Sequence, residues 1–152
     1  MTRNRRPIAR IYGVLSLVAF AGAVAIAALA AWSEAPALGI AYAALAFISL
    51  LATIAIFCSK CADRDLCGHV VLGPIARLMR RELRRGAYTG AELALTSIAL
   101  ALIFLLPLGW LWRFPLALGG FCLLLLLGSI DIRARVCPAC GNAACPLSRA
   151  NS

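Results

Sequence analysis

The residues in this sequence that are best suited to chemistry are cysteines, and four of them form two Cys-x-x-Cys pairs. The first pair is Cys58 and Cys61, and the second is Cys137 and Cys140. Two cysteines three positions apart on a tight turn direct both sulfurs to one point, and this supplies half of a tetrahedral S4 site. A second turn of the same kind completes the site. We therefore expect these four residues to bind one metal ion, with zinc as the preferred ion.

Three further candidate metal ligands lie close to the pairs, namely Cys67, His69 and Cys145. They allow two other assignments. In one, Cys58, Cys61, Cys67 and His69 form a local site and the three cysteines of the tail form an open three-ligand site. In the other, a run of three cysteines with a further ligand holds an iron–sulfur cluster. The spacing of the residues does not choose among these arrangements.

Four long apolar runs position the cysteines. Of the 152 residues, 63% are apolar and only 14% are charged, which excludes an ordinary soluble domain. Each run is long enough for a transmembrane helix, which needs about 20 apolar residues. We expect a single all-α integral membrane domain over 1–152, in which four helices form a compact bundle. The expected spans are about 11–32, 36–57, 90–110 and 114–132.

Local signals predict where some of these helices begin and end. Thr89 and Glu92 fit a capping box, in which each side chain bonds the backbone N–H of the other residue at a helix start. Pro107 is expected to kink or end the third span. Trp110 and Trp112 are expected at the outer interface, where amphipathic rings concentrate. Cys122 falls inside the fourth span, where a thiol behaves as a small apolar group.

Basic residues are concentrated in one set of loops. The segment before the first span, the loop between the second and third spans, and the tail contain 14 of the 15 basic residues, and only Arg113 lies on the opposite side. Because cytoplasmic loops are enriched in Lys and Arg, we expect both termini and both cysteine pairs on the cytoplasmic face of a bacterial inner membrane. This placement of the +9 net charge argues against a nucleic-acid partner.

Two polar segments follow from these boundaries, a cytoplasmic loop over 58–88 and a tail over 133–152. Within the loop, apolar side chains recur at helical spacing at Ile75, Leu78, Met79 and Leu83. The remaining positions carry Arg77, Arg80, Arg81, Arg84 and Arg85. The pattern predicts a basic amphipathic helix over about 70–85 that lies in the membrane interface and contacts anionic headgroups. Docking of an acidic partner protein is the alternative for the same surface.

The second cysteine pair also resembles a known metal-binding element. The stretch Cys137-Pro138-Ala139-Cys140-Gly141 is similar to the knuckle of zinc ribbons and rubredoxins, in which Cys-Pro-x-Cys-Gly supplies two metal ligands. The resemblance implies that Cys137 and Cys140 are ligands. The pair at 58–61 lacks both the proline and the glycine of that motif.

These observations favour a non-enzymatic role, in which a metal-bound cytoplasmic face docks a partner protein. No charged residue or histidine lies deep in a span, which argues against a transporter of protons or hydrophilic ions. Two alternatives remain open. The chain is similar in outline to quinone-linked thiol oxidoreductases and vitamin K epoxide reductases, which are four-helix bundles with cysteine pairs. It is also similar to bacterial mercury-uptake proteins, which are small, helical and rich in paired cysteines.

Overall fold

A computed structural model describes residues 6–60, 72, 75 and 88–139, and these residues form helices without strands. The main helices are α1 (Arg6–Glu34), α2 (Pro36–Ile56), α4 (Gly90–Phe104), α5 (Leu108–Leu111) and α6 (Pro115–Asp131). Three short turns extend two of them: η2 (Cys58–Lys60) follows α2, and η3 (Ile132–Val136) and η4 (Cys137–Ala139) follow α6. The predicted all-α class is confirmed.

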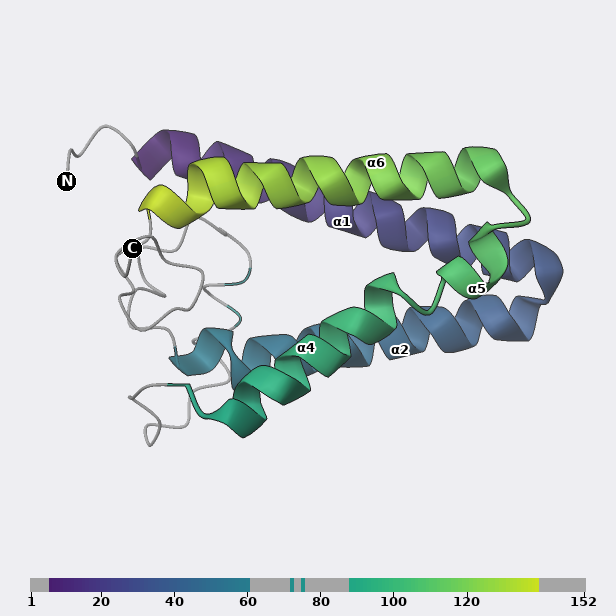
Figure 1. The fold of residues 1–152 in the computed structure, drawn as a ribbon, viewed down its shortest axis with the longest axis horizontal. Coiled ribbons are helices and arrows are strands. Elements are labelled where there is room, and N and C mark those ends of the chain that lie inside the picture. The colour runs from purple at the N-terminus through teal and green to yellow at the C-terminus, as the bar shows by residue number, and fades with distance from the viewer. Residues whose placement is uncertain (1–5, 61–71, 73–74, 76–87, 140–152) are drawn as a thin grey trace.

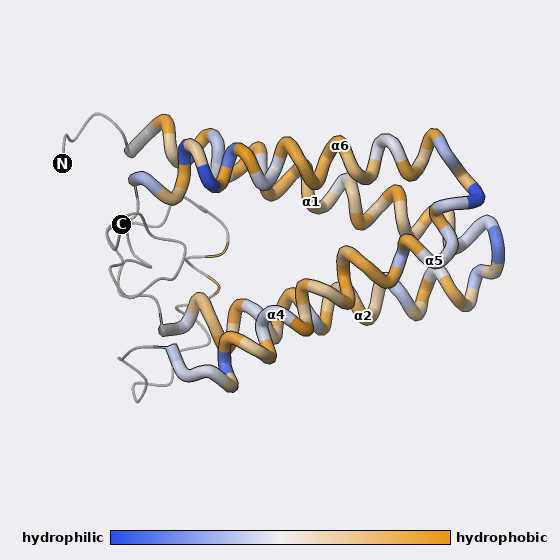
Figure 2. Tube along the Cα trace, in the orientation of Figure 1, coloured by the Kyte–Doolittle hydropathy of each residue, from blue (hydrophilic) through white to orange (hydrophobic). Residues whose placement is uncertain are grey.

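Four helical segments are long and apolar enough to cross a membrane, as the sequence predicts. They are Ile8–Glu34, Pro36–Ile56, Gly90–Leu111 and Pro115–Val136. Figure 2 shows apolar residues along the whole length of these helices and hydrophilic residues toward their ends. The four segments indicate a multi-pass membrane protein.

Helix α1 is central to the arrangement, because it packs against both α6 and α2, while α4 packs against α2. The helices therefore form two pairs, α1 with α6 and α2 with α4 (Figure 1). The ribbons of the two pairs are close at the end that holds the α1–α2 turn and α5, and they diverge toward the opposite end. Both α2 and α6 run antiparallel to α1, so the ends of α2 and α6 lie where α1 begins.

The best-packed part of the protein lies toward the α1–α2 turn. Its members are small residues of α1 and large side chains of the other helices: Ala23, Ala27, Ala30, Ala31, Tyr42, Trp110, Leu111 and Phe121. The ring of Tyr42 meets the ring of Trp110 edge-on, with the centroids 5.3 Å apart. Small side chains allow helices to approach closely where van der Waals packing drives their association. This cluster holds the two helix pairs together at one end.

The third span contains the break that Pro107 predicts. Helix α4 ends at Phe104, and α5 begins at Leu108. Two side-chain hydrogen bonds fix the segments on either side of the break: the Tyr42 hydroxyl of α2 donates to the carbonyl of Ile103 at 2.8 Å, and Nε1 of Trp110 in α5 donates to the carbonyl of Ala27 in α1 at 3.0 Å. The beginning of the same span also agrees with the sequence, because the capping box of Thr89 and Glu92 is present.

Candidate metal centre

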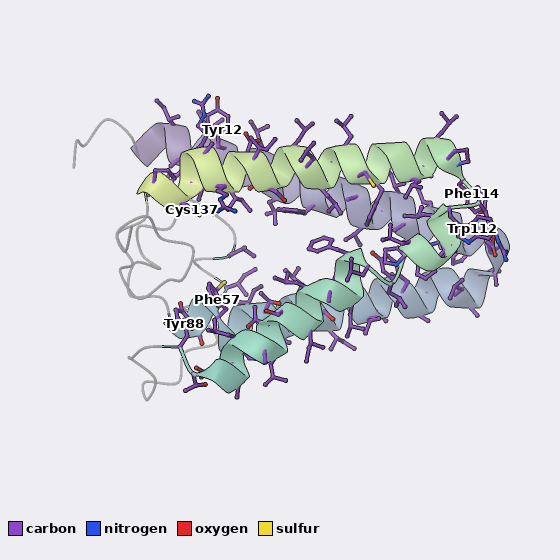
Figure 3. All side chains as sticks on the ribbon, viewed as in Figure 1. Tyr12, Phe57, Tyr88, Trp112, Phe114 and Cys137 are labelled. Carbon is purple, nitrogen blue, oxygen red and sulfur yellow. The ribbon has the colours of Figure 1, made fainter. Side chains whose placement is uncertain are left out.

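Cys58 lies immediately beyond the end of α2, on the short turn η2. Helix α2 ends at Ile56, and Phe57 follows as its C-cap, with its N–H bonded to the carbonyl of Thr53. The ring of Phe57 stacks on that of Tyr88 with centroids 4.5 Å apart, and the Tyr88 hydroxyl donates to the Phe57 carbonyl at 3.2 Å (Figure 3). These contacts join the end of α2 to the residue that precedes the α4 cap. Cys58 is half-buried on a turn that is held in this way.

Cys137 occupies the corresponding position after α6. The helix continues through a π-helical turn over Ile132–Val136 and ends in the 3₁₀ turn that begins at Cys137. Val136 is buried, and the guanidinium of Arg135 lies over the ring of Tyr12 at 4.9 Å from its centroid. This turn packs against α1, and the contact of Arg135 with Tyr12 places the packing near the beginning of that helix. Cys137 is half-buried, like Cys58.

The two cysteines lie at the same end of the molecule but on different helix pairs. Cys58 follows α2, and Cys137 follows α6; Figure 3 labels Cys137 at the end where Phe57 and Tyr88 also lie. Helices α2 and α6 flank α1, and the ribbons of the two pairs diverge at this end. Any ion that connected Cys58 with Cys137 would therefore link the two pairs at the end away from the packed cluster.

Most of the predicted ligand set lies outside the described residues. Cys61, Cys67, His69, Cys140 and Cys145 belong to the ranges 61–71 and 140–152. Over the described part of the chain, no three cysteine, histidine or acidic side chains come together as a metal-binding group. The four-cysteine site, the two-site arrangement and the iron–sulfur cluster therefore stay predictions. The amphipathic helix expected over about 70–85 also stays a prediction, because only Leu72 and Ile75 of that range are described.

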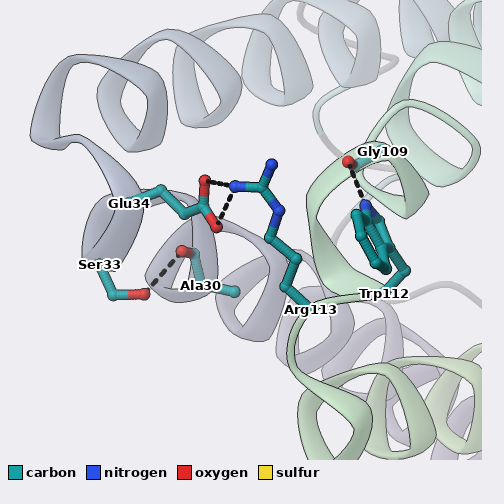
Figure 4. Close-up of polar contacts among 6 residues, drawn as sticks. All are labelled: Ala30, Ser33, Glu34, Gly109, Trp112 and Arg113. Atoms are coloured by element: carbon teal, nitrogen blue, oxygen red, sulfur yellow. Dashed lines mark hydrogen bonds and ion pairs between the residues drawn. The ribbon is translucent and has the colours of Figure 1, made fainter.

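An ion pair lies at the end of the molecule that is opposite to Cys58 and Cys137. Nη1 of Arg113 lies 2.7 Å from Oε2 and 3.0 Å from Oε1 of Glu34, which connects the α1–α2 turn with the turn before α6 (Figure 4). Arg113 is the single basic residue that the sequence assigns to this side. Glu34 pairs with it, and the other basic residues whose side chains are described, Arg10, Arg133 and Arg135, lie toward the cysteine end.

Sequence reasoning missed the polar roles of Tyr42 and Trp110. The prediction for Trp110 concerned only its level at the outer interface; the structure adds that Trp110 is buried and bonds the backbone of α1. Pro107 is the feature of the sequence from which a polar role for a side chain such as Tyr42 could have been predicted. A proline has no N–H, so the carbonyl of Ile103, four residues earlier, loses its helical partner and needs another donor.

No protein-family model, curated protein or solved structure matches this sequence.

Proposed function

We propose that this chain is a small multi-pass protein of the bacterial inner membrane that binds a metal ion at its cytoplasmic face. The ligands are Cys58, Cys61, Cys137 and Cys140, and the ion is zinc. The observation that carries the proposal is the position of Cys58 and Cys137, each directly after a membrane-spanning helix and both at the same end of the molecule. Their motif partners are three residues further along the chain.

The helix arrangement gives the ion a physical role. At the opposite end, the packed cluster and the bond from Trp110 to Ala27 hold the helix pairs together. At the cysteine end, the ribbons diverge, and α2 and α6 both contact α1 instead of each other as their main partner. A tetrahedral thiolate site with Zn–S distances of about 2.3 Å would fix the relative positions of these two helix ends.

A fixed cytoplasmic face of this kind would suit the docking of a partner protein. The partner would meet the metal-bound turns and the basic residues that the sequence assigns to the same side. A closed four-thiolate site keeps no open coordination position for a substrate, so a structural role follows from the ligand set more directly than a catalytic one.

The test is metal content, measured by mass spectrometry on protein purified anaerobically in detergent, together with its visible absorption spectrum. We expect one zinc per chain and no colour. Cys58→Ser and Cys137→Ser should each remove that zinc, because a three-thiolate remnant binds it less tightly. Cys122→Ser is the matched control, since Cys122 lies in the middle of α6, and it should leave the zinc in place.

The same experiment distinguishes the other arrangements. If Cys58→Ser and His69→Ala remove one ion while Cys137→Ser leaves it bound, the ligands form separate sites and the linked site is wrong. Iron with sulfide in a brown sample would identify an electron-transfer protein. Protein without metal whose thiols are oxidised by an added quinone would identify a thiol oxidoreductase.

A further inference from the structure

The basic residues at the two ends of the molecule have different partners. Arg113 forms an ion pair in which its Nη1 donates to both carboxylate oxygens of Glu34. Arg135, in the turn after α6, forms no ion pair with any described residue, and its polar contact is the face of the Tyr12 ring at 4.9 Å. Asp131 lies four residues earlier on the same helix, and it is not paired with Arg135. No described carboxylate therefore offsets the positive charge of Arg135 or occupies its hydrogen-bond donors.

Tyr12 contributes a second unused donor at the same place. Its ring is half-buried, whereas Arg135 is exposed, so the ring supports the guanidinium from one side. The Tyr12 hydroxyl forms no hydrogen bond with a described residue. The guanidinium carbon of Arg135 lies 4.9 Å from the centre of the Tyr12 ring, so the positive charge is adjacent to the ring that carries this hydroxyl. Two elements that are distant in sequence, α1 and η3, therefore bring a hydroxyl-bearing ring and a positive charge together, and no described carboxylate is paired with that charge.

We propose that Tyr12 and Arg135 bind the phosphate of an anionic phospholipid headgroup. A guanidinium binds phosphate oxygens with charge-assisted, often bidentate hydrogen bonds, and a tyrosine hydroxyl supplies one more donor. The two side chains supply a positive charge and hydrogen-bond donors but no negative charge for the cationic part of a zwitterionic headgroup, so a net negative headgroup such as phosphatidylglycerol fits better than a zwitterionic one. This site uses none of the proposed metal ligands, although Arg135 belongs to the turn that precedes Cys137.

Its location favours a lipid over a free phosphate. Tyr12 lies near the start of the apolar segment Ile8–Glu34, and Arg135 near the end of the apolar segment Pro115–Val136. Both residues are thus at the level where a membrane-spanning helix passes into the headgroups, and tyrosine is enriched there. The exposed apolar side chains of α6 next to this turn, such as Leu127 and Ile130, would contact the acyl chains of the same lipid.

Native mass spectrometry of the full chain in detergent tests the site. The protein is titrated with phosphatidylglycerol and, separately, with phosphatidylcholine of the same acyl chains, and bound lipids are counted. Arg135→Gln should weaken phosphatidylglycerol binding about fivefold, the effect of one basic residue near an anionic surface, and should leave phosphatidylcholine binding unchanged. Tyr12→Phe keeps the ring under Arg135 and removes the hydroxyl, so it should cause a smaller loss.

Arg133→Gln is the charge-matched control, because Arg133 is exposed in the same turn and contacts no aromatic ring among the described residues. An equal loss with Arg133→Gln would replace the proposed site with a diffuse basic surface and overturn the proposal. Equal binding of the two lipids by the unchanged protein would also overturn it. Displacement of phosphatidylglycerol by excess inorganic phosphate would show a site for a free anion instead of a lipid. Thermal unfolding in phosphatidylcholine verifies that each variant is folded.

Discussion

The hydroxyl of Tyr42 in α2 donates a 2.8 Å hydrogen bond to the carbonyl oxygen of Ile103 in α4. In a continuous α-helix this carbonyl would accept the N–H of the residue four positions later, which here is Pro107 and has no N–H. Tyr42 therefore replaces a backbone donor that the sequence removes. An unpaired carbonyl is unfavourable inside a membrane, where no water can bond it, so a side chain of the second span supports the break in the third.

Tyr42→Phe should lower the free energy of unfolding by about 1 kcal/mol, which is within the range measured for hydrogen bonds between membrane helices. Unfolding by sodium dodecyl sulfate in zwitterionic bicelles measures the effect. Tyr12→Phe is the matched control, because the Tyr12 hydroxyl has no hydrogen-bond partner among the described residues, and it should change stability by less than about half as much.

Pro107→Ala should make the Tyr42 hydroxyl less important. An alanine at this position supplies an N–H that can bond the Ile103 carbonyl, so Tyr42→Phe should cost less in the Pro107→Ala background than in the unchanged protein. A double-mutant cycle measures this difference. Strictly additive effects of the two substitutions would show that Tyr42 does not compensate for the proline.

Trp110→Phe should destabilise the protein more than Trp112→Phe. Trp110 is buried and its Nε1 bonds the carbonyl of Ala27 across to α1. Trp112 is 65% exposed, and its Nε1 bonds Gly109 within its own segment. The phenyl ring keeps most of the apolar contact at either position, so the difference of about 1 kcal/mol reports the hydrogen bond between segments. The same bicelle titration measures it, and equal effects would contradict the assigned role of Trp110.

The sequence predicts the spans well because length and apolar composition define them, and it predicts the capping box because its residues are adjacent. Helix partners are harder to predict. A span such as α6 is apolar on all sides, so no periodic pattern distinguishes the lipid-facing side from the packed side. The central position of α1 and the divergence of the two pairs are therefore visible only in the structure.

The candidate site, like the fold, could be predicted from the sequence only in part. The positions of Cys58 and Cys137 follow from the ends of the spans, and the structure has both at one end of the molecule. The support around them does not follow from the sequence. The stack of Phe57 on Tyr88 and that of Arg135 on Tyr12 join residues 31 and 123 positions apart, and neither belongs to a recognisable motif.

Gly39→Ala should destabilise the turn between α1 and α2. A Cβ at Gly39 would lie 2.9 Å from Cβ and 3.0 Å from the backbone nitrogen of Trp32. Because these atoms belong to the backbone or are attached to it, the helices must shift, and we expect a cost of about 1–3 kcal/mol. Gly119→Ala in α6 is the control, since its Cβ would meet nothing within 4 Å. A neutral Gly39→Ala would contradict the close approach of the two helices.

The ion pair of Glu34 and Arg113 should contribute little to stability. The Arg113 side chain is 56% exposed, and exposed pairs are worth about 0.2–1 kcal/mol. A double-mutant cycle with Glu34→Gln and Arg113→Gln should give a coupling energy in this range at low salt. The coupling should decrease at high salt because of screening. A coupling that is larger and independent of salt would show that the pair is less accessible to water than the structure indicates.

Cys58→Ser and Cys137→Ser should destabilise the zinc-loaded protein to a similar extent and without additivity. If both residues bind one ion, either substitution removes it, and the second has nothing further to remove. We expect each single variant and the double variant to lower the midpoint of thermal unfolding by at least about 5 °C, given roughly 2–4 °C per kcal/mol for a chain of this length. Cys122→Ser should leave the midpoint unchanged. After the zinc has been removed with a chelator, all four variants should unfold at the same temperature as the unchanged protein. Additive losses in the loaded protein would show two separate sites, and equal losses in loaded and chelated protein would show that the thiols act by packing alone. The comparison thus separates metal binding across the two helix pairs from every arrangement that is confined to one of them.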